Sequence, residues 1–306
     1  MIHRTIAAAA RVRFAALAIL WTSCLASGAL AQESQFGDEL YRPRLRQPGK
    51  DVMWLPTPDA MVTRMLEAAK TNRDDVVYDL GAGDGRIPIA AAREFGARAV
   101  GIEYDADLAA LARRNAERAG VADKVEIVQG DIFNEDFSKA TVITLYLLPD
   151  LNQRMRPRLL KMKPGTRVVS HLWDMGEWEP DETLRAGDSE AFVWIVPAPV
   201  GGRWRIPEGY GYPKALIDIT QRFQRIGGTL TIRGETQPLL GAYVRGATLG
   251  FTFVAPDGGV RSVRARVDGD AFEGSLQFAG HLTPISGRRV QRGVDAGSPG
   301  SKAESP

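Results

Sequence analysis

One short stretch of the chain combines an apolar strand, an acid and three glycines. Residues 76–86 read VVYDLGAGDGR, with Asp79 at the end of the apolar run. The glycines that follow it are Gly81, Gly83 and Gly85. Glycines at this spacing allow a sharp turn and a close ligand, and the amides of a following helix point toward that ligand. Arg86 stands where a dinucleotide loop has its third glycine, so the pattern does not favour a pyrophosphate.

Two further acids follow the next two predicted strands. Glu103 ends a strand over residues 98–103, and Asp131 follows a strand over residues 124–129. The carboxyl ends of parallel strands meet at one edge of a doubly wound sheet, where ligands bind, so we expect both acids to lie near Asp79. Asp79 would attract an ammonium group, Glu103 would accept ribose hydroxyls, and Asp131 would accept from an adenine amino group. These three acids predict a site for S-adenosylmethionine.

The elements that must position these acids alternate between helix and strand. Apolar periodicity and turn signals predict helices over residues 57–69, 85–95, 105–120 and 151–162, and strands over residues 76–80, 98–103, 124–129, 141–148 and 166–172. In the first helix we expect Thr57 to be the cap and Pro58 to occupy the first helical position. The succession predicts an α/β fold with a parallel, doubly wound, Rossmann-like sheet.

The pattern changes to a period of two after residue 199. Apolar residues then alternate with polar ones, and turn signals such as Gly227-Gly228 and Asp268-Gly269 separate the runs. Inward-facing positions are expected at Ile217, Ile219, Phe223, Leu249, Phe251, Phe253, Val263, Ala265, Val267, Phe272, Gly274, Leu276 and Phe278. We therefore expect an all-β antiparallel barrel or sandwich domain after the Rossmann-like sheet.

The first 31 residues resemble a secretory leader. Three arginines precede an apolar run over residues 14–25, and Ala29-Leu30-Ala31 has the small-residue pattern of a cleavage site. The expectation is a periplasmic or secreted protein; the alternative is a leader that is retained as an inner-membrane anchor, because the apolar stretch approaches the roughly 18 to 20 residues that span a bilayer. The mature chain itself is not expected to cross a membrane.

Charge and residue usage exclude several classes of site. The chain has 39 basic and 37 acidic residues, and without the leader's three arginines the numbers become 36 and 37. This near-neutral charge does not indicate a nucleic-acid-binding surface, so no nucleic-acid partner is expected. Cys24 is the only cysteine and only His171 and His281 follow the leader, so we expect no metal site.

Three motifs together resemble a known superfamily. Asp79-Leu-Gly-Ala-Gly-Asp-Gly85, Val100-Gly-Ile-Glu103 and Gly130-Asp-Ile132 resemble the cofactor motifs of class I S-adenosylmethionine-dependent methyltransferases. Within that superfamily, the motifs Pro56-Thr-Pro58, Thr144-Leu-Tyr-Leu-Leu-Pro149 and Lys163-Pro-Gly-Thr-Arg-Val-Val-Ser170 resemble the ATP-synthase c-subunit lysine methyltransferases and their bacterial relatives. The resemblance covers residues 52–196 and implies a lysine amine as methyl acceptor. A methyltransferase acting on a protein or a small-molecule amine is therefore the first hypothesis.

The resemblance also assigns residues to the site. It implies cofactor binding by Asp79, Gly81, Ala82, Gly83, Gly85, Glu103, Tyr104, Asp131 and Ile132. Tyr146 and Pro149 follow the fourth strand, where the superfamily lines its acceptor channel, and His171 either assists proton removal or has a structural role. The resulting domain assignment is signal peptide 1–31, extended arm 32–50, methyltransferase domain 51–199, antiparallel β domain 200–292 and disordered tail 293–306.

Two other functions remain open at this point. The first is an exported, catalytically inactive binding protein that keeps a nucleoside pocket and whose β domain carries the function; export favours it, since S-adenosylmethionine is made in the cytoplasm. The second is a nicotinamide-dependent oxidoreductase, which the glycine spacing disfavours.

Overall fold

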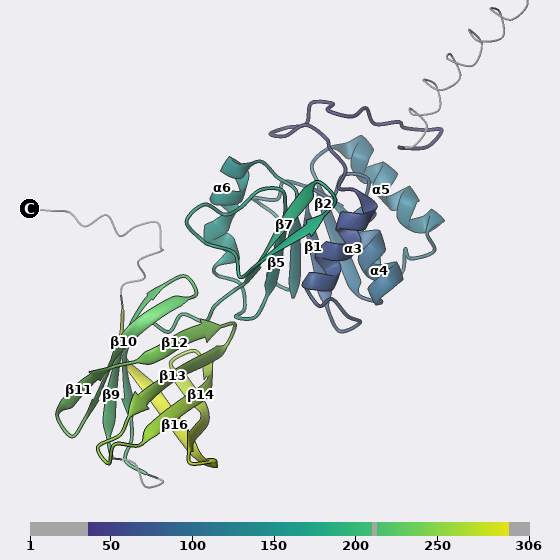
Figure 1. Ribbon diagram of the computed structural model, residues 1–306. Coiled ribbons are helices and arrows are strands. Elements are labelled where there is room, and N and C mark those ends of the chain that lie inside the picture. The colour runs from purple at the N-terminus through teal and green to yellow at the C-terminus, as the bar shows by residue number, and fades with distance from the viewer. Residues whose placement is uncertain (1–35, 210–212, 294–306) are drawn as a thin grey trace, which may run out of the picture. The chain divides into compact units, whose positions relative to one another are not determined.

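The computed structural model describes residues 36–209 and 213–293 (Figure 1). The predicted leader, and the predicted disordered tail apart from residue 293, lie outside these ranges. Residues up to Pro56 form a separate unit, whose described part is mostly loop with a single bridge between Pro48 and Met53. Across the described ranges, we find no helix with the length and apolar character that crossing a bilayer would need.

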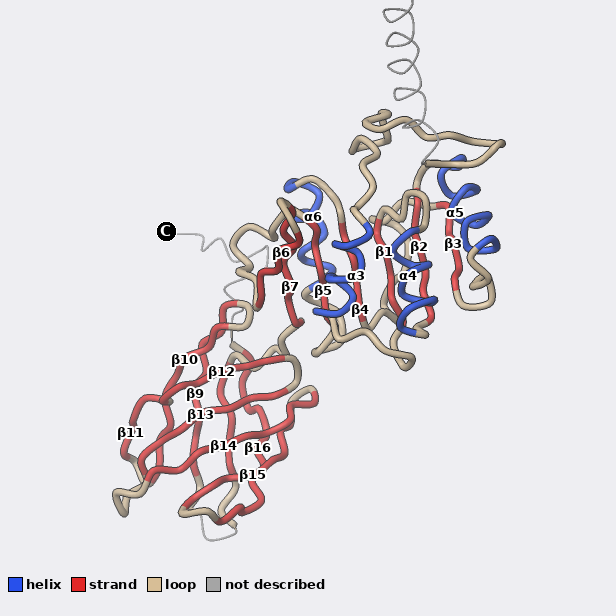
Figure 2. The backbone as a smooth tube through the Cα atoms, turned by 45° about the vertical axis from the view of Figure 1, so that its right-hand side comes forward, coloured by secondary structure: helices blue, strands red, loops and turns tan. Residues whose placement is uncertain are grey.

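The first sheet has seven strands in the order β3-β2-β1-β4-β5-β7-β6 (Figure 2). These strands are β1 (Val76–Leu80), β2 (Arg98–Glu103), β3 (Val125–Gln129), β4 (Val142–Leu145), β5 (Arg167–His171), β6 (Glu182–Ala186) and β7 (Ser189–Ile195). Strands β1 to β5 are parallel, as predicted. The antiparallel hairpin β6–β7 extends the sheet beyond β5 and was not predicted from the sequence.

Within the described residues, four helices accompany this sheet: α3 (Asp59–Ala68), α4 (Arg86–Phe95), α5 (Ala106–Arg118) and α6 (Pro149–Leu159). The connections β1–α4–β2 and β2–α5–β3 proceed from the middle of the sheet toward the β3 edge, whereas the connection β4–α6–β5 proceeds toward the β6 edge. Because such connections are right-handed, α6 covers the opposite face. Asp105 caps α5 by accepting from the amides of Asp107 and Leu108.

The start of α3 differs from the prediction by one residue. Pro58 is the N-cap, not the first helical residue, and no side chain caps the helix. The hydroxyl of Thr57, predicted to be the cap, instead lies 3.2 Å from Nδ1 of His171 on β5. A buried polar partner in the sheet therefore takes the hydroxyl that sequence pattern assigned to the helix end.

A network of buried polar groups joins the amino ends of β1, β4 and β5. Arg167 donates to Asp75 at 2.7 Å and to the carbonyl oxygen of Ala69 at 2.8 Å. Thr141 donates its hydroxyl to Asp75 at 2.7 Å and accepts from the amide of Val76 at 2.9 Å. Because Asp75 is only 5% exposed, Arg167 is the cation that makes its burial tolerable.

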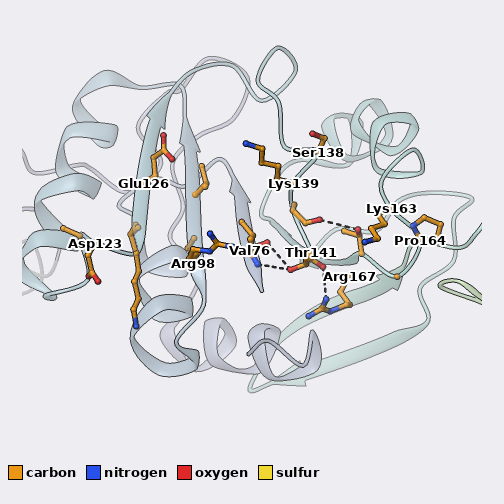
Figure 3. Close-up of a pocket in the computed structure, with 18 residues that line it drawn as sticks. Val76, Arg98, Asp123, Glu126, Ser138, Lys139, Thr141, Lys163, Pro164 and Arg167 are labelled. Atoms are coloured by element: carbon orange, nitrogen blue, oxygen red, sulfur yellow. Dashed lines mark hydrogen bonds between the residues drawn. The ribbon is translucent and has the colours of Figure 1, made fainter. Parts of the chain in front are cut away.

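A cavity of about 830 Å³ opens beside this network (Figure 3). Its lining includes Val76, Arg98 and Thr141, which lie at the amino ends of parallel strands. The glycine turn follows the carboxyl end of β1, so this cavity lies at the opposite edge of the sheet from the predicted cofactor site.

The second sheet has nine strands and forms the predicted all-β region. Neighbours follow the order β11-β10-β9-β8-β16-β15-β14-β13-β12, and all pairs are antiparallel. The strands are β8 (Gly202–Ile206), β9 (Ala215–Arg222), β10 (Arg225–Ile232), β11 (Glu235–Pro238), β12 (Leu240–Arg245), β13 (Thr248–Val254), β14 (Val260–Asp268), β15 (Ala271–Phe278) and β16 (His281–Arg292). The sheet curls around a single apolar core, which is the barrel-like arrangement expected from the alternation.

Three of the predicted inward-facing positions behave differently, and the first, Gly274, is exposed although it pairs with the buried Ala265. Phe223 follows the end of β9 and has a positive φ of 54°, so it belongs to a turn and not to a strand. Phe278 keeps inward parity, but it is the last residue of β15 and remains 38% exposed, with the guanidinium of Arg261 3.9 Å from its ring centroid. Alternation alone cannot show where a strand leaves the core.

The buried network gives a first prediction. Replacing Arg167 by Met keeps most of the apolar stem but leaves Asp75 buried without its cation, so we expect unfolding to cost about 3 kcal/mol less. Arg185→Met is the control, because its side chain is 82% exposed and lies 3.9 Å from Glu190, and we expect a loss of about 0.5 kcal/mol or less. Urea denaturation measures both; equal losses would contradict the role given to Arg167.

Candidate functional site

The glycine turn joins the carboxyl end of β1 to the start of α4. Gly81, Gly83 and Gly85 all have positive φ values, of 95°, 54° and 82°. The amides of Gly81 and Ala82 donate to the carbonyl oxygen of Ile102 at 2.9 and 3.0 Å, which ties the turn to β2. Left-handed backbone at three nearby positions requires glycine there, because side chains make this conformation costly.

The turn is also held by close packing. A Cβ built on Gly101 of β2 would lie 2.7 Å from Cβ of Ala82, and one on Gly85 would lie 3.0 Å from Cβ of Ala112 on α5. Asn115 of α5 donates to the carbonyl oxygen of Asp84 at 2.7 Å. The turn is therefore fixed against both β2 and α5.

Asp79 is the last but one residue of β1 and is 3% exposed. Thr144 on the adjacent β4 donates its hydroxyl to Oδ1 of Asp79 at 2.7 Å. Burial raises the pKa of Asp79 to about 7; the Thr144 hydrogen bond opposes this rise, and the charges of Glu103 and Asp84 add to it. Asp79 is thus a carboxyl group whose ionised form lacks a compensating charge.

Glu103 ends β2 and is 9% exposed. Its Oε2 accepts from the amide of Gly83 at 2.7 Å, and its Oε1 accepts from the amide of Asp105 at 2.9 Å. Burial raises its pKa, while these backbone hydrogen bonds lower it. Each carboxylate oxygen has a further lone pair, so Glu103 can hold the turn and still accept from a ligand.

The third acid has a more local role in the structure. Asp131 follows β3 and is partly buried, and its Oδ1 accepts from the amide of Phe133 at 2.9 Å. Ile132 is also partly buried, whereas Tyr104 after β2 is 53% exposed. Strands β3, β2 and β1 are parallel neighbours, so the structure brings the carboxyl ends that carry Asp131, Glu103 and Asp79 to one edge.

Asp84 and Thr144 belong to this site and were not predicted. Asp84 forms an ion pair with Arg86 at 2.7 Å, and Arg86 also donates to the carbonyl oxygen of Thr57 at 2.8 Å. Arg86, which stands where a dinucleotide loop has its third glycine, is therefore engaged in an ion pair with Asp84. Thr144 could have been found in the sequence as the one hydroxyl residue in the otherwise apolar run VITL of β4.

Tyr146 and His171 lie together at the carboxyl ends of β4 and β5, and Pro149 follows three residues after Tyr146. Tyr146 follows β4 directly, and its ring centroid lies 4.1 Å from that of His171, while Pro149 opens α6. Nδ1 of His171 faces the hydroxyl of Thr57 at 3.2 Å and Nε2 faces that of Ser189 at 2.5 Å. Burial lowers the pKa of His171 to about 4, so the ring is neutral at ordinary pH.

This geometry favours a structural role for His171. Both ring nitrogens already have hydroxyl partners, and a neutral imidazole with a pKa of about 4 is a weak base at pH 7. Burial raises the pKa of Tyr146, so its phenol stays protonated. His171 therefore packs against the ring of Tyr146.

The site suits a cationic ligand. No cationic side chain in the described ranges forms an ion pair with Asp79 or Glu103, so two neighbouring buried carboxylates lack a counter-charge. The zwitterionic amino-acid end and the ribose hydroxyls of S-adenosylmethionine offer the matching groups. Among the described residues, no cluster of three or more His, Cys, Asp or Glu could hold a metal ion.

Comparisons with known proteins give the site its context. Residues 79–182 match the ANTKMT methyltransferase domain. A protein-lysine N-methyltransferase of Saccharolobus islandicus is 47% identical over 45% of this chain and 86% of its own length. The ATP synthase c-subunit lysine N-methyltransferase of Mus musculus is 29% identical over 48% of this chain, which spans 60% of that relative.

Solved structures include a further similar protein. A crystal structure titled an RNA methyltransferase from Salinibacter ruber, in complex with S-adenosyl-L-homocysteine, is 53% identical, covers 51% of this chain and 98% of its own, and has a TM-score of 0.47.

The archaeal match and the matched domain agree with the acid pair and the glycine turn. The chain belongs to the class I S-adenosylmethionine-dependent methyltransferases, in the family that contains the protein-lysine N-methyltransferases.

Proposed function

We propose that this enzyme transfers a methyl group from S-adenosylmethionine to the side-chain amine of a lysine in a protein. The observation that carries the donor assignment is the buried, uncompensated pair of Asp79 and Glu103 beside the glycine turn. The names of the similar archaeal and mouse proteins support a lysine as acceptor. None of the observations favours an inactive binding protein over the enzyme.

The donor's residues have distinct roles in this proposal. Asp79 pairs with the ammonium group, Glu103 accepts from the ribose hydroxyls, and Asp131 accepts from the adenine amino group, with Ile132 and Tyr104 beside it. Gly81, Ala82, Gly83 and Gly85 keep the turn free of large side chains. The donor, when bound, supplies a methyl group on a positively charged sulfur, whose departure needs no protonation.

The acceptor region needs only to orient and desolvate an amine. A lysine must be neutral to act as a nucleophile, and a partly apolar surround lowers its pKa. Tyr146 and Pro149 supply such a surround at the end of β4 and the start of α6, with His171 packed against the Tyr146 ring. Alignment of amine and methyl group then supplies most of the acceleration.

Export of the enzyme remains our proposal on sequence grounds alone. The basic head, apolar run and A-x-A end of residues 1–31 support a cleaved leader and a periplasmic location. A mass matching the chain from Gln32 in the periplasmic fraction would support it, and full-length chain confined to the cytoplasm would contradict it.

The acid pair gives a binding prediction. Asp79→Asn and Glu103→Gln should each weaken S-adenosylmethionine binding by about tenfold or more, because hydrogen bonds to charged groups contribute about 1.5–3 kcal/mol. Asp74→Asn, an exposed acid five residues before Asp79, should bind like the parent chain. Calorimetric titration measures these affinities, and unchanged binding in both site variants would remove the carboxylates from the site.

The raised pKa of Asp79 predicts a pH dependence. Below about pH 7 Asp79 is protonated in the free enzyme, and a cationic donor must displace that proton. Donor affinity should therefore rise with pH through about 7 and then level off. The stability of the ligand-free chain has the opposite pH dependence. The unfolded chain releases this proton above about pH 4, whereas the folded chain keeps it up to about pH 7. The free energy of unfolding therefore falls as pH rises from about 4 to 7.

Asp79→Asn separates these two effects. The variant should show donor affinity that no longer rises across pH 6 to 8, and at pH 8 the ligand-free variant should be at least as stable as the parent, since it buries no charge. Titration calorimetry and urea denaturation over that pH range provide the measurements. A parent chain whose donor affinity is flat from pH 6 to 8 would contradict the assignment.

The acceptor proposal is tested with methyl-labelled S-adenosylmethionine and extracts of the cell that makes the chain. Label should appear in protein and be recovered as methylated lysine after acid hydrolysis, and Asp79→Asn should incorporate at least tenfold less at limiting donor. Nuclease treatment of a parallel sample is the control. Label that nuclease releases, or that is recovered on another amino acid, would overturn the lysine assignment.

A further inference from the structure

The nine-stranded sheet carries a charge that the whole-chain balance conceals. Residues 200–292 contain twelve arginines and one lysine against seven carboxylates, a net charge of +6, whereas the whole chain has a net charge of +2. Lysine is almost absent from this excess. Arginine binds phosphate groups in a bidentate manner, so the composition favours an anionic, phosphate-bearing partner.

Several of these arginines are exposed without an ion pair, and four of them lie on β8, β14 and β16. Arg205, Arg264, Arg266 and Arg288 are exposed, and none has an ion-pair partner among the described residues. Arg288 of β16 lies directly opposite Arg205 of β8. Like charges placed opposite each other destabilise a sheet, and an anionic partner bound to this face would relieve that repulsion. The outward acids nearest to them are Asp268, on β14 itself, and Glu273 of β15, which lies opposite Arg266.

Exposed apolar side chains gather at one end of strands β12, β13, β14 and β16. Val254 ends β13 and lies opposite Val260, which begins β14. Leu240 begins β12, and Leu282 lies at the start of β16. Val260 and Leu282 are 59% and 67% exposed, and Val254 and Leu240 are also exposed. We call these four residues the apolar end of the sheet.

The register places the apolar end, an aromatic ring and the arginines in sequence along the outer face. Beyond Val254 and Val260, the next outward row runs from Leu240 through Thr252, Ser262 and Gln277 to Leu282. The row after that contains Tyr243, Gly250 and Arg264, and the following one contains Arg266. Successive outward rows are about 7 Å apart, so apolar, aromatic and cationic groups succeed one another over roughly 20 Å.

This order matches the polarity profile of a bilayer surface. Acyl chains accept apolar side chains, tyrosine prefers the interface, and lipid phosphates attract arginine. Tyr243 is 43% exposed, and its ring lies over Gly250, where a Cβ would come within 2.3 Å of it. Asp257 is the acid in the β13–β14 turn, and Arg261 pairs with it, which reduces its repulsion from anionic lipid.

The connection to the rest of the chain leaves this end open. β8 begins at Gly202, which pairs with Arg292 at the finish of β16, whereas the apolar end lies at the start of β16. The chain therefore enters the domain at the opposite end of the sheet from Val260 and Leu282. From these observations we propose that the apolar end and the adjacent arginines of the β domain dock on the surface of an anionic lipid bilayer.

The test is co-sedimentation of the purified chain from Gln32 onward with lipid vesicles. This form is used because the apolar run of residues 14–25 would bind lipid by itself. The chain should sediment with phosphatidylcholine vesicles in which roughly one lipid in three is phosphatidylglycerol, enough to give a negative surface potential, and not with phosphatidylcholine alone. Binding should weaken as salt screens the arginines.

Paired variants assign the binding to this surface. Arg264→Gln with Arg266→Gln should reduce the partition coefficient about 30-fold, since each cation near the surface contributes about fivefold. Val260→Asn with Leu282→Asn should reduce it at least tenfold. The controls are Val290→Asn, an exposed valine farther along β16, and Arg185→Gln on β6, which should both bind like the parent. Unchanged thermal unfolding shows that each variant is folded.

Three results would overturn the proposal. The first is absence of binding to the anionic vesicles. The second is equal binding by the Val260/Leu282 double variant and the Val290 control, which would show that the apolar end does not contact lipid. The third is tight binding of a single-stranded oligonucleotide that displaces the vesicles and depends on Arg264 and Arg266 but not on Val260 and Leu282, because the surface would then serve nucleic acid.

Discussion

Burial of two neighbouring carboxyl groups without a compensating cation is the constraint on which the proposed donor site depends. Asp79 and Glu103 end adjacent strands, and each has a pKa raised by burial, yet no cation of the described chain compensates them. Hydrogen bonds from Thr144 and from the amides of Gly83 and Asp105 keep the pair in place. A fold tolerates this arrangement only at a stability cost, and a positively charged ligand relieves it. Other elements of the sheet serve mainly to hold these two groups together.

The opposite edge of the same sheet resolves the same problem internally. There Asp75 is also buried, but Arg167 and Thr141 supply the cation and the hydroxyl that it needs. The contrast between the two edges separates a structural acid from a ligand-binding one better than burial does, because Asp75 and Asp79 are both almost fully buried. It also explains why the cavity beside Arg167 does not need a cationic ligand.

Much of the fold and part of the site could be predicted from the sequence. The parallel strands, the cofactor family and the convergence of strand ends followed from apolar runs and from acids at their ends, since parallel topology leaves little choice of edge. The partners of those acids could not be predicted. Thr57 and Ser189 reach His171 from distant segments, and a local pattern assigned Thr57 to a helix cap instead. The β6–β7 hairpin was missed because its first strand, ETLRA, has only two apolar residues and gives no clear alternation.

The close contact of Ala82 with Gly101, and of Gly85 with Ala112, has a consequence for turnover. Because the turn is already held between a strand and a helix, donor binding should cost little backbone conformational entropy. In the proposed site, the same rigid turn also receives the demethylated nucleoside, which differs there only by the methyl group and the charge on sulfur. Discrimination between the donor and its demethylated product must then come from the sulfur centre. The rate of product release becomes part of the catalytic cycle.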